Sequence, residues 1–490
     1  MNKKYLVPFI IFFLCPKGNS EEIKNLDLSL QESIEMSVSR NFDIKIESLN
    51  PEIQNLEVQK IRDSFNLVLG FTPEIRGNIQ PTSNSFIAGG TRLEQLFQNY
   101  NLYFKKKFES GGELSLRFDN AITGTNSTRV DFNPIFAPAL SLNFNHPILK
   151  NSFNGSKRIL ISENISEIAL INLKSKLIDT INQTKQTYWN LVASKLKVEV
   201  FESSLKLSQE LLKDNKERLK AGFASKIDIL NAETAIAARQ EALFQAKNDL
   251  GNSQDNLKRL INPDEKFFQN WEFNINTKDI PKYTQKKFNI DELYKKALER
   301  PDYKVSLINS KNIDIQKEIN EKNKLPVLDI NSSVGLQTID RNYPSSIQSL
   351  FSFKGYFWNV GLNFEIPVQG NLGETEYKQS VLNQSQQKLI VENLKQKIYN
   401  ELRNNLRLIE TNKNRINSNS YAKKLAQEQL NSENEKLKAG FSTSFQILQY
   451  QRDLEQAKLN ELNAIIDYLK SLSSLEQITG TSIEDNNLKI

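Results

Sequence analysis

The sequence predicts a mainly α-helical protein with a membrane β-sheet, built from two copies of a strand hairpin followed by a long helical hairpin. The first observation is a repeat, because Glu217–Leu230 recurs as Glu435–Leu448 about 218 positions later. This spacing is far longer than a solenoid period, so the chain is a duplicated half-molecule. The other observations are leucine columns at heptad spacing and segments in which apolar and polar residues alternate.

The first 20 residues have the pattern of a secretory signal peptide. Lys3 and Lys4 precede an apolar core, and small residues before Glu21 mark the expected cleavage site. Acylation of Cys15 in a lipoprotein is the alternative, although bulky residues stand where lipoprotein signals usually carry small ones. No later segment approaches about 18 consecutive apolar residues, so a membrane-spanning part of this exported chain would consist of strands.

The composition argues against several classes of function. The formal net charge of +6 falls to about +3 on cleavage, which is too weak to predict nucleic-acid binding. Cys15 is the only cysteine and His146 the only histidine, so metal sites and catalytic triads built on these residues are not expected. We expect no enzymatic activity, no cofactor and no nucleic-acid partner.

The two repeats begin in similar ways. A capping box at Ser29 starts the first repeat, and Asn289 precedes the first helix of the second. The expected divisions are a signal peptide (1–20), a first repeat (21–262), a linker (263–288), a second repeat (289–480) and a C-terminal tail (481–490).

Strands are expected where the apolar period changes from 3.6 to 2 residues. Helices are predicted to run as far as Pro73 and Pro326, because proline cannot extend a helix, and alternating segments such as 356–366 follow. Four strands are clear, and six result if 100–108 and 111–119 both join the sheet. The expected loops are 81–99, 120–138 and 338–352.

Alternation alone fits either a membrane barrel or a soluble sandwich. Export and aromatic crowding favour the membrane, where rings such as those of Tyr356, Phe357 and Trp358 form interfacial girdles. Four to six strands cannot close a barrel, which needs at least about eight, and open edges are not tolerated in lipid. We therefore expect several chains to share one barrel.

Each repeat also contains one very long helix. A leucine-rich column recurs every seven residues from Leu191 to Leu219, and a second from Leu402 to Leu437 is interrupted by Lys423. The segment 156–219 would be nearly 100 Å long at ~1.5 Å per residue. Sustained heptads indicate helices that wind along other helices.

A matching break ends each long helix. Gly222 and Gly440 can adopt the left-handed conformation that terminates a helix. Capping boxes that restart the chain are predicted at Ser225–Asp228 and Thr443–Gln446. Helix capping thus explains the glycines and the cap residues without any binding role. It does not explain why Phe223 and Phe441 follow the glycines.

With these features the chain resembles the TolC family of outer-membrane efflux proteins over residues 25–480. The motifs that carry the resemblance are the paired Ala-Gly-Phe tips, Arg300-Pro301-Asp302, and the strand end 366–370. The resemblance implies a homotrimer in the outer membrane, with four strands per chain in a twelve-stranded barrel above a helical tunnel in the periplasm. It also implies a passive duct, with a periplasmic adaptor and an inner-membrane efflux pump or ABC transporter as partners.

The sequence departs from the family pattern in three places. An additional hairpin around 109–112 could enlarge the barrel or fold aside. Gln446 and Gln449 occupy positions that are aspartates in well-known members, so an acidic ring at the tunnel mouth is not expected. Asp228 matches a residue that helps to latch the closed tip, but the basic partner expected near Ser442 is missing.

We predict that the two tips dock the adaptor, because both copies keep an almost identical exposed sequence there. The alternative is that both phenylalanines pack onto their own hairpins. A second alternative for the whole chain is a periplasmic coiled-coil adaptor or scaffold without a barrel. The expected docking residues are Leu219, Ala221, Gly222, Phe223, Leu437, Ala439, Gly440 and Phe441.

Overall fold

The computed structural model describes residues 25–83, 88, 90–262, 273–486 and 488, so the segment expected to be a signal peptide, with Cys15, lies outside the described residues. The chain forms two compact units. Unit 1 comprises Met1–Asn41, Ile181–Gln285 and Ile409–Ser473, and unit 2 comprises the remaining segments. Both repeats contribute to each unit. Among the described residues no helix is both long and apolar enough to cross a bilayer.

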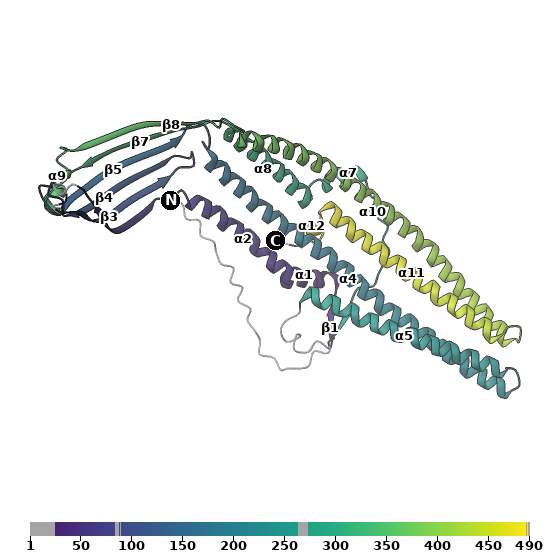
Figure 1. Cartoon of the computed structure of the whole chain (residues 1–490). Helices are drawn as coiled ribbons and strands as arrows, with labels where there is room; N and C mark the ends of the chain where they lie inside the picture. Colours follow the sequence, from purple (N-terminus) through teal and green to yellow (C-terminus); the bar gives the residue numbers. More distant parts are fainter. Residues whose placement is uncertain (1–24, 84–87, 89, 263–272, 487, 489–490) are drawn as a thin grey trace. The chain divides into compact units, whose positions relative to one another are not determined.

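Two long helical hairpins dominate the chain (Figure 1). Helices α4 (Asn154–Lys220) and α10 (Leu372–Lys438) each have 67 residues. Their return helices, α5 (Lys226–Ile261) and α11 (Ser444–Thr479), each have 36. The predicted duplication and the rods of about 100 Å are therefore confirmed. The shorter helices are α1 (Leu30–Arg40), α2 (Phe42–Asp63), α7 (Ile290–Ala297), α8 (Pro301–Asn323), α9 (Tyr343–Leu350) and α12 (Ser482–Asp485).

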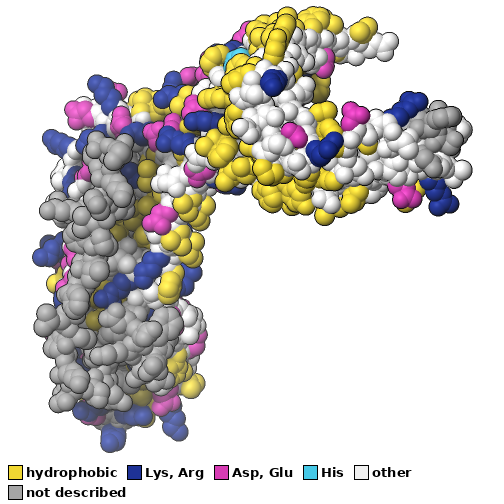
Figure 2. All heavy atoms as spheres, turned by 90° about the vertical axis from the view of Figure 1, so that its left-hand side faces the viewer, with side chains coloured by type: hydrophobic (Ala, Val, Ile, Leu, Met, Phe, Trp, Pro, Cys, Tyr) yellow, Lys and Arg dark blue, Asp and Glu magenta, His cyan; other side chains and the backbone are white. Residues whose placement is uncertain are grey.

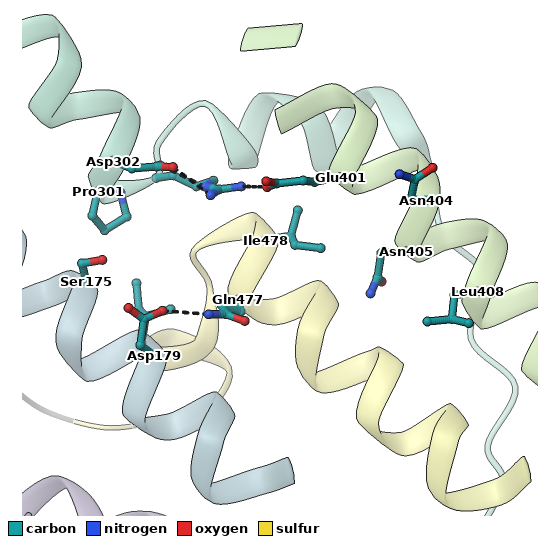
Figure 3. A pocket seen from close by; sticks show the side chains of 12 residues that line it. Ser175, Asp179, Pro301, Asp302, Glu401, Asn404, Asn405, Leu408, Gln477 and Ile478 are labelled. Carbon is teal, nitrogen blue, oxygen red and sulfur yellow. Dashed lines mark hydrogen bonds and ion pairs between the residues drawn. The ribbon is translucent and has the colours of Figure 1, made fainter. Parts of the chain in front are cut away.

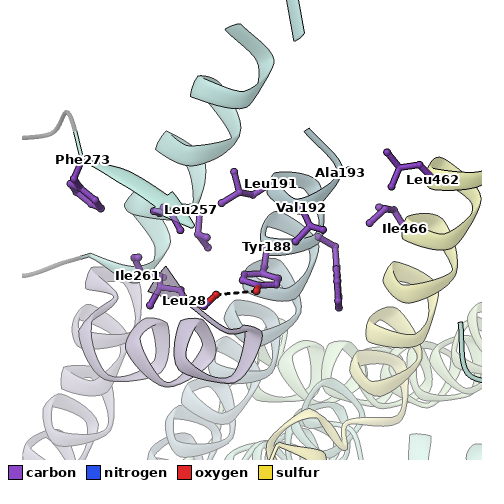
Figure 4. Packing of buried hydrophobic residues seen from close by; sticks show 12 residues of the cluster. Leu28, Tyr188, Leu191, Val192, Ala193, Leu257, Ile261, Phe273, Leu462 and Ile466 are labelled. Atoms are coloured by element: carbon purple, nitrogen blue, oxygen red, sulfur yellow. Dashed lines mark hydrogen bonds between the residues drawn. The ribbon is translucent and has the colours of Figure 1, made fainter. Parts of the chain in front are cut away.

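The core of unit 1 lies where α4, α5 and α11 meet a two-stranded parallel sheet of β1 (Asn25–Leu28) and β6 (Asn274–Thr277). Tyr188 of α4 is fully buried in this core, and its hydroxyl donates a hydrogen bond of 3.1 Å to the carbonyl oxygen of Leu28 (Figure 4). The second hydrogen bond, of 2.6 Å, reaches Asp279. The Tyr188 hydroxyl therefore ties β1 to α4.

Unit 2 contains a six-stranded antiparallel sheet in the order β2-β3-β4-β5-β7-β8. The additional hairpin therefore joins the sheet between the two expected strands of the first repeat, and the four-strand plan implied by the family is wrong for this chain. The strand bounds are β2 Val68–Pro81, β3 Arg92–Lys107, β4 Glu113–Thr125, β5 Ile135–Pro147, β7 Val327–Gln337 and β8 Tyr356–Glu365.

The register gives the sheet one apolar and one mostly polar face. One row across all six strands is entirely apolar, and the adjacent row on the other face is mostly polar. The apolar row is Leu69, Phe104, Leu116, Leu142, Val334 and Trp358. The polar-face row is Val68, Lys105, Ser115, Asn143, Ser333 and Asn359. Figure 2 shows hydrophobic side chains gathered over the strands.

The aromatic cluster of β8 is divided between these faces. Tyr356 and Trp358 are exposed on the apolar face. Phe357 alternates to the other face, where its ring lies over Gly335 so closely that a Cβ there would come within 2.5 Å of Phe357 Cζ. Strand alternation thus separates Phe357 from the two residues with which it was grouped.

Several expected boundaries were wrong. Helix α2 ends at Asp63 and Pro73 lies inside β2, because β2 is an edge strand, where a missing N–H is tolerated. The expected loops 81–99 and 120–138 contain the ends of four strands, and 338–352 contains α9. Polar composition suggested loops here, whereas one polar face is ordinary for a strand that lies in a half-buried sheet.

The Arg300-Pro301-Asp302 motif starts α8 in unit 2. Pro301 occupies the first turn, where its missing N–H costs nothing. The Arg300 guanidinium donates to Asp302 at 2.8 and 3.0 Å and to Glu401 of α10 at 2.7 Å. Figure 3 shows this bridge beside a cavity of about 630 Å³. The motif therefore fixes α8 on α10.

Candidate functional site at the two hairpin tips

The first tip is a Schellman turn. Gly222 has a φ of +77°, in the left-handed region that glycine adopts readily. The backbone N–H of Phe223 donates to the carbonyl of Arg218 at 2.8 Å, and that of Gly222 to Leu219 at 3.1 Å. These bonds satisfy carbonyls that the end of α4 leaves free.

The second tip repeats this geometry. Gly440 has a φ of +82°. The N–H of Phe441 donates to Lys436 at 2.8 Å, and that of Gly440 donates to Leu437 at 3.1 Å. The helix break predicted from the repeat is therefore present in both copies, with the same hydrogen bonds.

The return helices restart with different caps. Ser225 and Asp228 form a complete capping box, in which the Ser225 N–H donates to the Asp228 carboxylate at 2.9 Å and the Asp228 N–H to Ser225 Oγ at 3.2 Å. In the second copy the Gln446 N–H donates to Thr443 Oγ1 at 3.3 Å. The Gln449 amide donates to Asp453 at 3.1 Å, along its own helix. The Asp228 carboxylate is thus occupied as a cap.

Both tip phenylalanines project into solvent in the single chain. Phe223 is 77% exposed and Phe441 84%. Ala221 and Ala439 are also exposed, whereas Leu437 is buried and Leu219 half-buried. Neither ring packs onto its own hairpin, which counts against the intramolecular alternative. The structure therefore presents two similar apolar tips at the end of unit 1.

Polar contacts hold the two tips next to each other. Arg218 Nη1 donates to the carbonyl of Leu437 at 3.0 Å. Asn215 of α4 is fully buried, accepts from Ser444 Oγ at 2.6 Å and donates to the Asp228 carbonyl at 3.3 Å. A buried amide costs free energy unless its hydrogen bonds are made. The two partners of Asn215 are met in one alignment of the hairpins, so Asn215 fixes the register between them. Sequence reasoning missed it, although an asparagine three positions after Leu212 of the heptad column was the available signal.

The residue equivalent to Asn215 in the second copy is Glu433. Its buried carboxylate accepts from Ser442 Oγ at 2.5 Å and from Lys436 Nζ at 3.2 Å. The Ser442 hydrogen bond lowers the pKa of Glu433 below its ordinary value, and Lys436 acts in the same direction. In the second tip a carboxylate is therefore hydrogen-bonded within its own hairpin. In the first tip the equivalent residue is a neutral amide that is hydrogen-bonded to the other hairpin.

These tips contain no catalytic constellation. Throughout the described part of the chain, no three histidine, cysteine, aspartate or glutamate side chains are grouped to hold a metal ion. The site offers backbone turns, small residues and aromatic rings, which are features of a contact surface between proteins.

Residues 136–263 match the family model described as outer membrane efflux protein. A comparison with curated proteins found no significant match. Among solved structures, the chain resembles the Campylobacter jejuni CmeC outer membrane channel, with a TM-score of 0.68, 15% identity, and coverage of 94% of this chain and 90% of that one. The open-state Neisseria gonorrhoeae MtrE outer membrane channel gives a TM-score of 0.63 and 16% identity, and the match covers 99% of this chain and 98% of that one.

A third structure, the outer membrane protein VceC from Vibrio cholerae, gives a TM-score of 0.66, 12% identity, and coverage of 92% of this chain and 96% of that one. These structures show that the expected fold is correct. The resemblance to outer-membrane efflux proteins is confirmed over residues 136–263, where the family model matches.

Proposed function

We propose that this chain is an outer-membrane efflux channel, and that it forms a homotrimeric passive exit duct of a tripartite efflux or type I secretion system. The observation that carries the proposal is a six-stranded sheet with one apolar face and two unpaired edges, β2 and β8. Open edges are not tolerated in lipid, and six strands are too few to close a barrel. Three copies that pair β2 of one with β8 of the next would supply about eighteen strands.

The exposed apolar face favours this duct over a soluble adaptor or scaffold. Leu362, Trp358 and Ile75 are each about two-thirds exposed on that face. A soluble scaffold would leave these side chains in water, whereas outer-membrane lipid would cover them. Crosslinking in mild detergent is expected to give trimers, and a soluble monomer that needs no detergent would support the scaffold instead.

A pair of substitutions tests the face assignment. Val360→Arg places a charge on the apolar face at the middle of β8 and is expected to cost about 2–4 kcal/mol of barrel stability near mid-membrane. Asn359→Arg introduces the same charge one residue earlier, on the polar face, and is expected to change little. Heat-modified migration of the trimer on gels measures the difference. Equal effects of the two substitutions would contradict the assignment.

The tips are proposed to dock a periplasmic adaptor that connects the duct to an inner-membrane efflux pump or ABC transporter. Exposed aromatic rings beside small residues fit the grooves of a partner helix. Support comes from the exposure of Phe223 and Phe441, the shared Schellman turns, and the polar contacts that hold the tips together. The turns make the tips rigid, which lowers the entropic cost of binding.

The double variant Phe223→Ser/Phe441→Ser tests docking. We expect normal trimer yield and membrane insertion, but loss of export and of crosslinks from the tips to the adaptor. Phe244→Ser is a matched control, because Phe244 is 64% exposed on α5 away from the turn. Full export by the double variant would contradict docking, and a loss of trimer or protease nicking at the tips would support a packing role.

A further inference from the structure

Helix α2 in unit 2 carries an apolar stripe that stays exposed in the described chain. The stripe recurs at alternating spacings of four and three residues, which is the spacing of a coiled-coil seam. Its members are Phe42, Ile46, Leu49, Ile53 and Leu56, and each is between 54% and 66% exposed. The buried residues Ile44 and Val58 lie on the opposite side of the helix. The stripe is therefore open to a second helix.

Side-chain contacts place α2 at one edge of the helical layer of unit 2 and the first part of α10 at the other. Lys176 of α4 pairs with Asp43 of α2 at 2.9 Å. Lys157 of α4 pairs with Glu318 of α8 at 2.8 Å, and hydrogen bonds join α8 to α10. The helices thus follow the order of the strands that they adjoin, β2, β5, β7 and β8 (Figure 1). The two edge helices adjoin the two edge strands.

Helix α10 exposes a matching pair of leucines. Leu382 and Leu389 are 70% and 71% exposed. Gln387 faces α8, where its amide donates to the Ser306 carbonyl at 3.1 Å. Because residues two positions apart lie about 200° apart around a helix, Leu389 faces away from α8. Leu382 has the same relation to the buried Ser380.

The exposed residues of the two edge helices match in their distance from the sheet. Helix α2 ends four residues before β2, and α10 begins six residues after β8. Ile53 and Ile46 lie 10 and 17 residues before the end of α2, and Leu382 and Leu389 lie 10 and 17 residues after the start of α10. At ~1.5 Å per residue, each pair shares one level, about 15 or 25 Å from the helix ends. Helix α2 runs toward the sheet and α10 away from it, so the two would pack antiparallel.

The strand edges alone do not fix how two copies align. Strand β2 has 14 residues and β8 has 10. A shift of two residues, about 7 Å, therefore leaves every residue of β8 with a partner and keeps both faces of the sheet unchanged. The same shift exceeds the helical pitch of ~5.4 Å and would move Ile53 away from Leu382. A contact between the helices would select one alignment.

We propose that α2 of one copy packs along α10 of the next copy, with Ile53 on Leu382 and Ile46 on Leu389, and that this seam sets the register in which β2 pairs with β8. The occupant of the α2 stripe is a second copy, because the seam continues the pairing of the edge strands along the same boundary. The inference rests on the proposed trimer and adds the residues that align its copies.

Disulfide crosslinking of the full-length trimer tests the pairing. In Ile53→Cys/Leu382→Cys, oxidation should link neighbouring copies into covalent trimers on non-reducing gels, because the only native cysteine, Cys15, lies in the expected signal peptide. Ile53→Cys/Leu389→Cys is the matched control, since its partners would lie about 10 Å apart along the seam, too far for a disulfide. Equal linkage in the two variants, or a disulfide within one chain, would overturn the pairing.

A charge exchange tests the same contact without a covalent bond. Ile53→Glu places an unpaired charge in the seam and should lower the trimer yield roughly tenfold. Ile53→Glu/Leu382→Lys should restore most of that yield, because the charges would meet between copies, whereas Ile53→Glu/Leu389→Lys should not. Leu170→Glu changes an exposed leucine of α4, which lies inside the layer, and should leave the yield unchanged. Rescue by both lysines or by neither would contradict the pairing.

A cysteine scan of the strand edges tests the register. Ile75→Cys on β2 is combined in turn with cysteine at the apolar-face residues of β8, which are Tyr356, Trp358, Val360, Leu362 and Phe364. One partner should dominate while the seam is intact. In trimers recovered from Ile46→Ala/Ile53→Ala, linkage should spread to the partners two residues away. The same single partner in both backgrounds would overturn the role in register.

The outcomes also separate the seam from the duct. Wild-type protein that is monomeric in mild detergent would overturn the trimer and the seam together. Trimers that link at neither pair of helix cysteines would overturn the seam and leave the duct intact. Linkage of Ile53→Cys to another protein in preference to a second copy would assign the α2 stripe to the adaptor, and would overturn the seam.

Discussion

The two hairpins have equal helix lengths and the same turn, but they are packed differently in unit 1. Ile447 and Leu448 of α11 are buried, with Leu448 only 6% exposed. Their equivalents in α5 are Ile229, which is half-buried, and Leu230, which is 62% exposed. The second hairpin therefore builds the core of a single chain near the tips, whereas the first offers an apolar face that a neighbouring copy would cover in the proposed trimer.

The buried polar residues differ in the same sense. Asn215 reaches across to Ser444 of the other hairpin, whereas Glu433 is bonded within its own hairpin by Ser442 and Lys436. Duplication has thus preserved the turn, while the residues that position each hairpin have diverged. The two tips are therefore similar surfaces that different residues hold in place.

The largest difference is expected on truncating the equivalent leucines. Leu448→Ala removes a buried side chain and should lower the free energy of local unfolding of the second tip by about 2–5 kcal/mol. Leu230→Ala should change the first hairpin of a single chain by about 0.5 kcal/mol or less, since the side chain is exposed. Hydrogen exchange at the two tips, in chains dissociated from the trimer, measures both. Equal losses of local unfolding free energy at the two tips would contradict the difference in packing between the hairpins.

Substitution of Asn215 is expected to have the next largest effect on the stability of the tips. Asn215→Ala removes the acceptor of the buried Ser444 hydroxyl and the additional hydrogen bond to the Asp228 carbonyl, which should cost about 1–3 kcal/mol. Because Asn215 joins the hairpins, exchange should rise at both tips. Asn431→Ala, an exposed asparagine of α10, is the control. A change confined to the first tip would show that Asn215 does not couple the two.

Sequence reasoning predicted the elements that depend on local patterns. The heptad columns predicted helices of nearly the observed length, and the repeat predicted both left-handed glycines. What it could not predict depends on contacts between distant segments. The burial of Leu448 but not Leu230, and the partners of Asn215, follow from which hairpin packs against which, and both copies have the same leucine at that position.

The sheet illustrates the same limit. Alternation identified the strands, but whether 100–108 and 111–119 paired with the rest was left open, since pairing is a long-range property. Pro73 was assigned as a helix stop because the sequence does not show that β2 is an edge strand. Phe357 was grouped with its neighbours by composition, although the period of 2 already places it on the other face.

Exchanging the caps should give a smaller effect. Asp228→Gln converts the charged cap of α5 into the residue found in the second copy, and Gln446→Glu does the opposite for α11. A carboxylate in the first helical turn contributes about 0.3–1 kcal/mol through the macrodipole, so exchange at the start of α5 should rise and that at α11 should fall. High salt should reduce both changes. A change of the same sign in both variants would contradict the cap argument.

The smallest effect concerns pH, and it should distinguish Glu433 from Asn215. The hydrogen bond from Ser442 lowers the pKa of Glu433 in the folded chain, so folding favours the carboxylate. This stabilisation is fully present above the ordinary glutamate pKa of about 4.3 and is lost as the pH falls through the lower folded-state pKa. Glu433→Gln removes the titration. Proteolysis at the second tip should therefore differ between wild type and Glu433→Gln at pH 7, and this difference should shrink near pH 3. A difference that stays constant with pH would show that the Glu433 charge does not stabilise the tip.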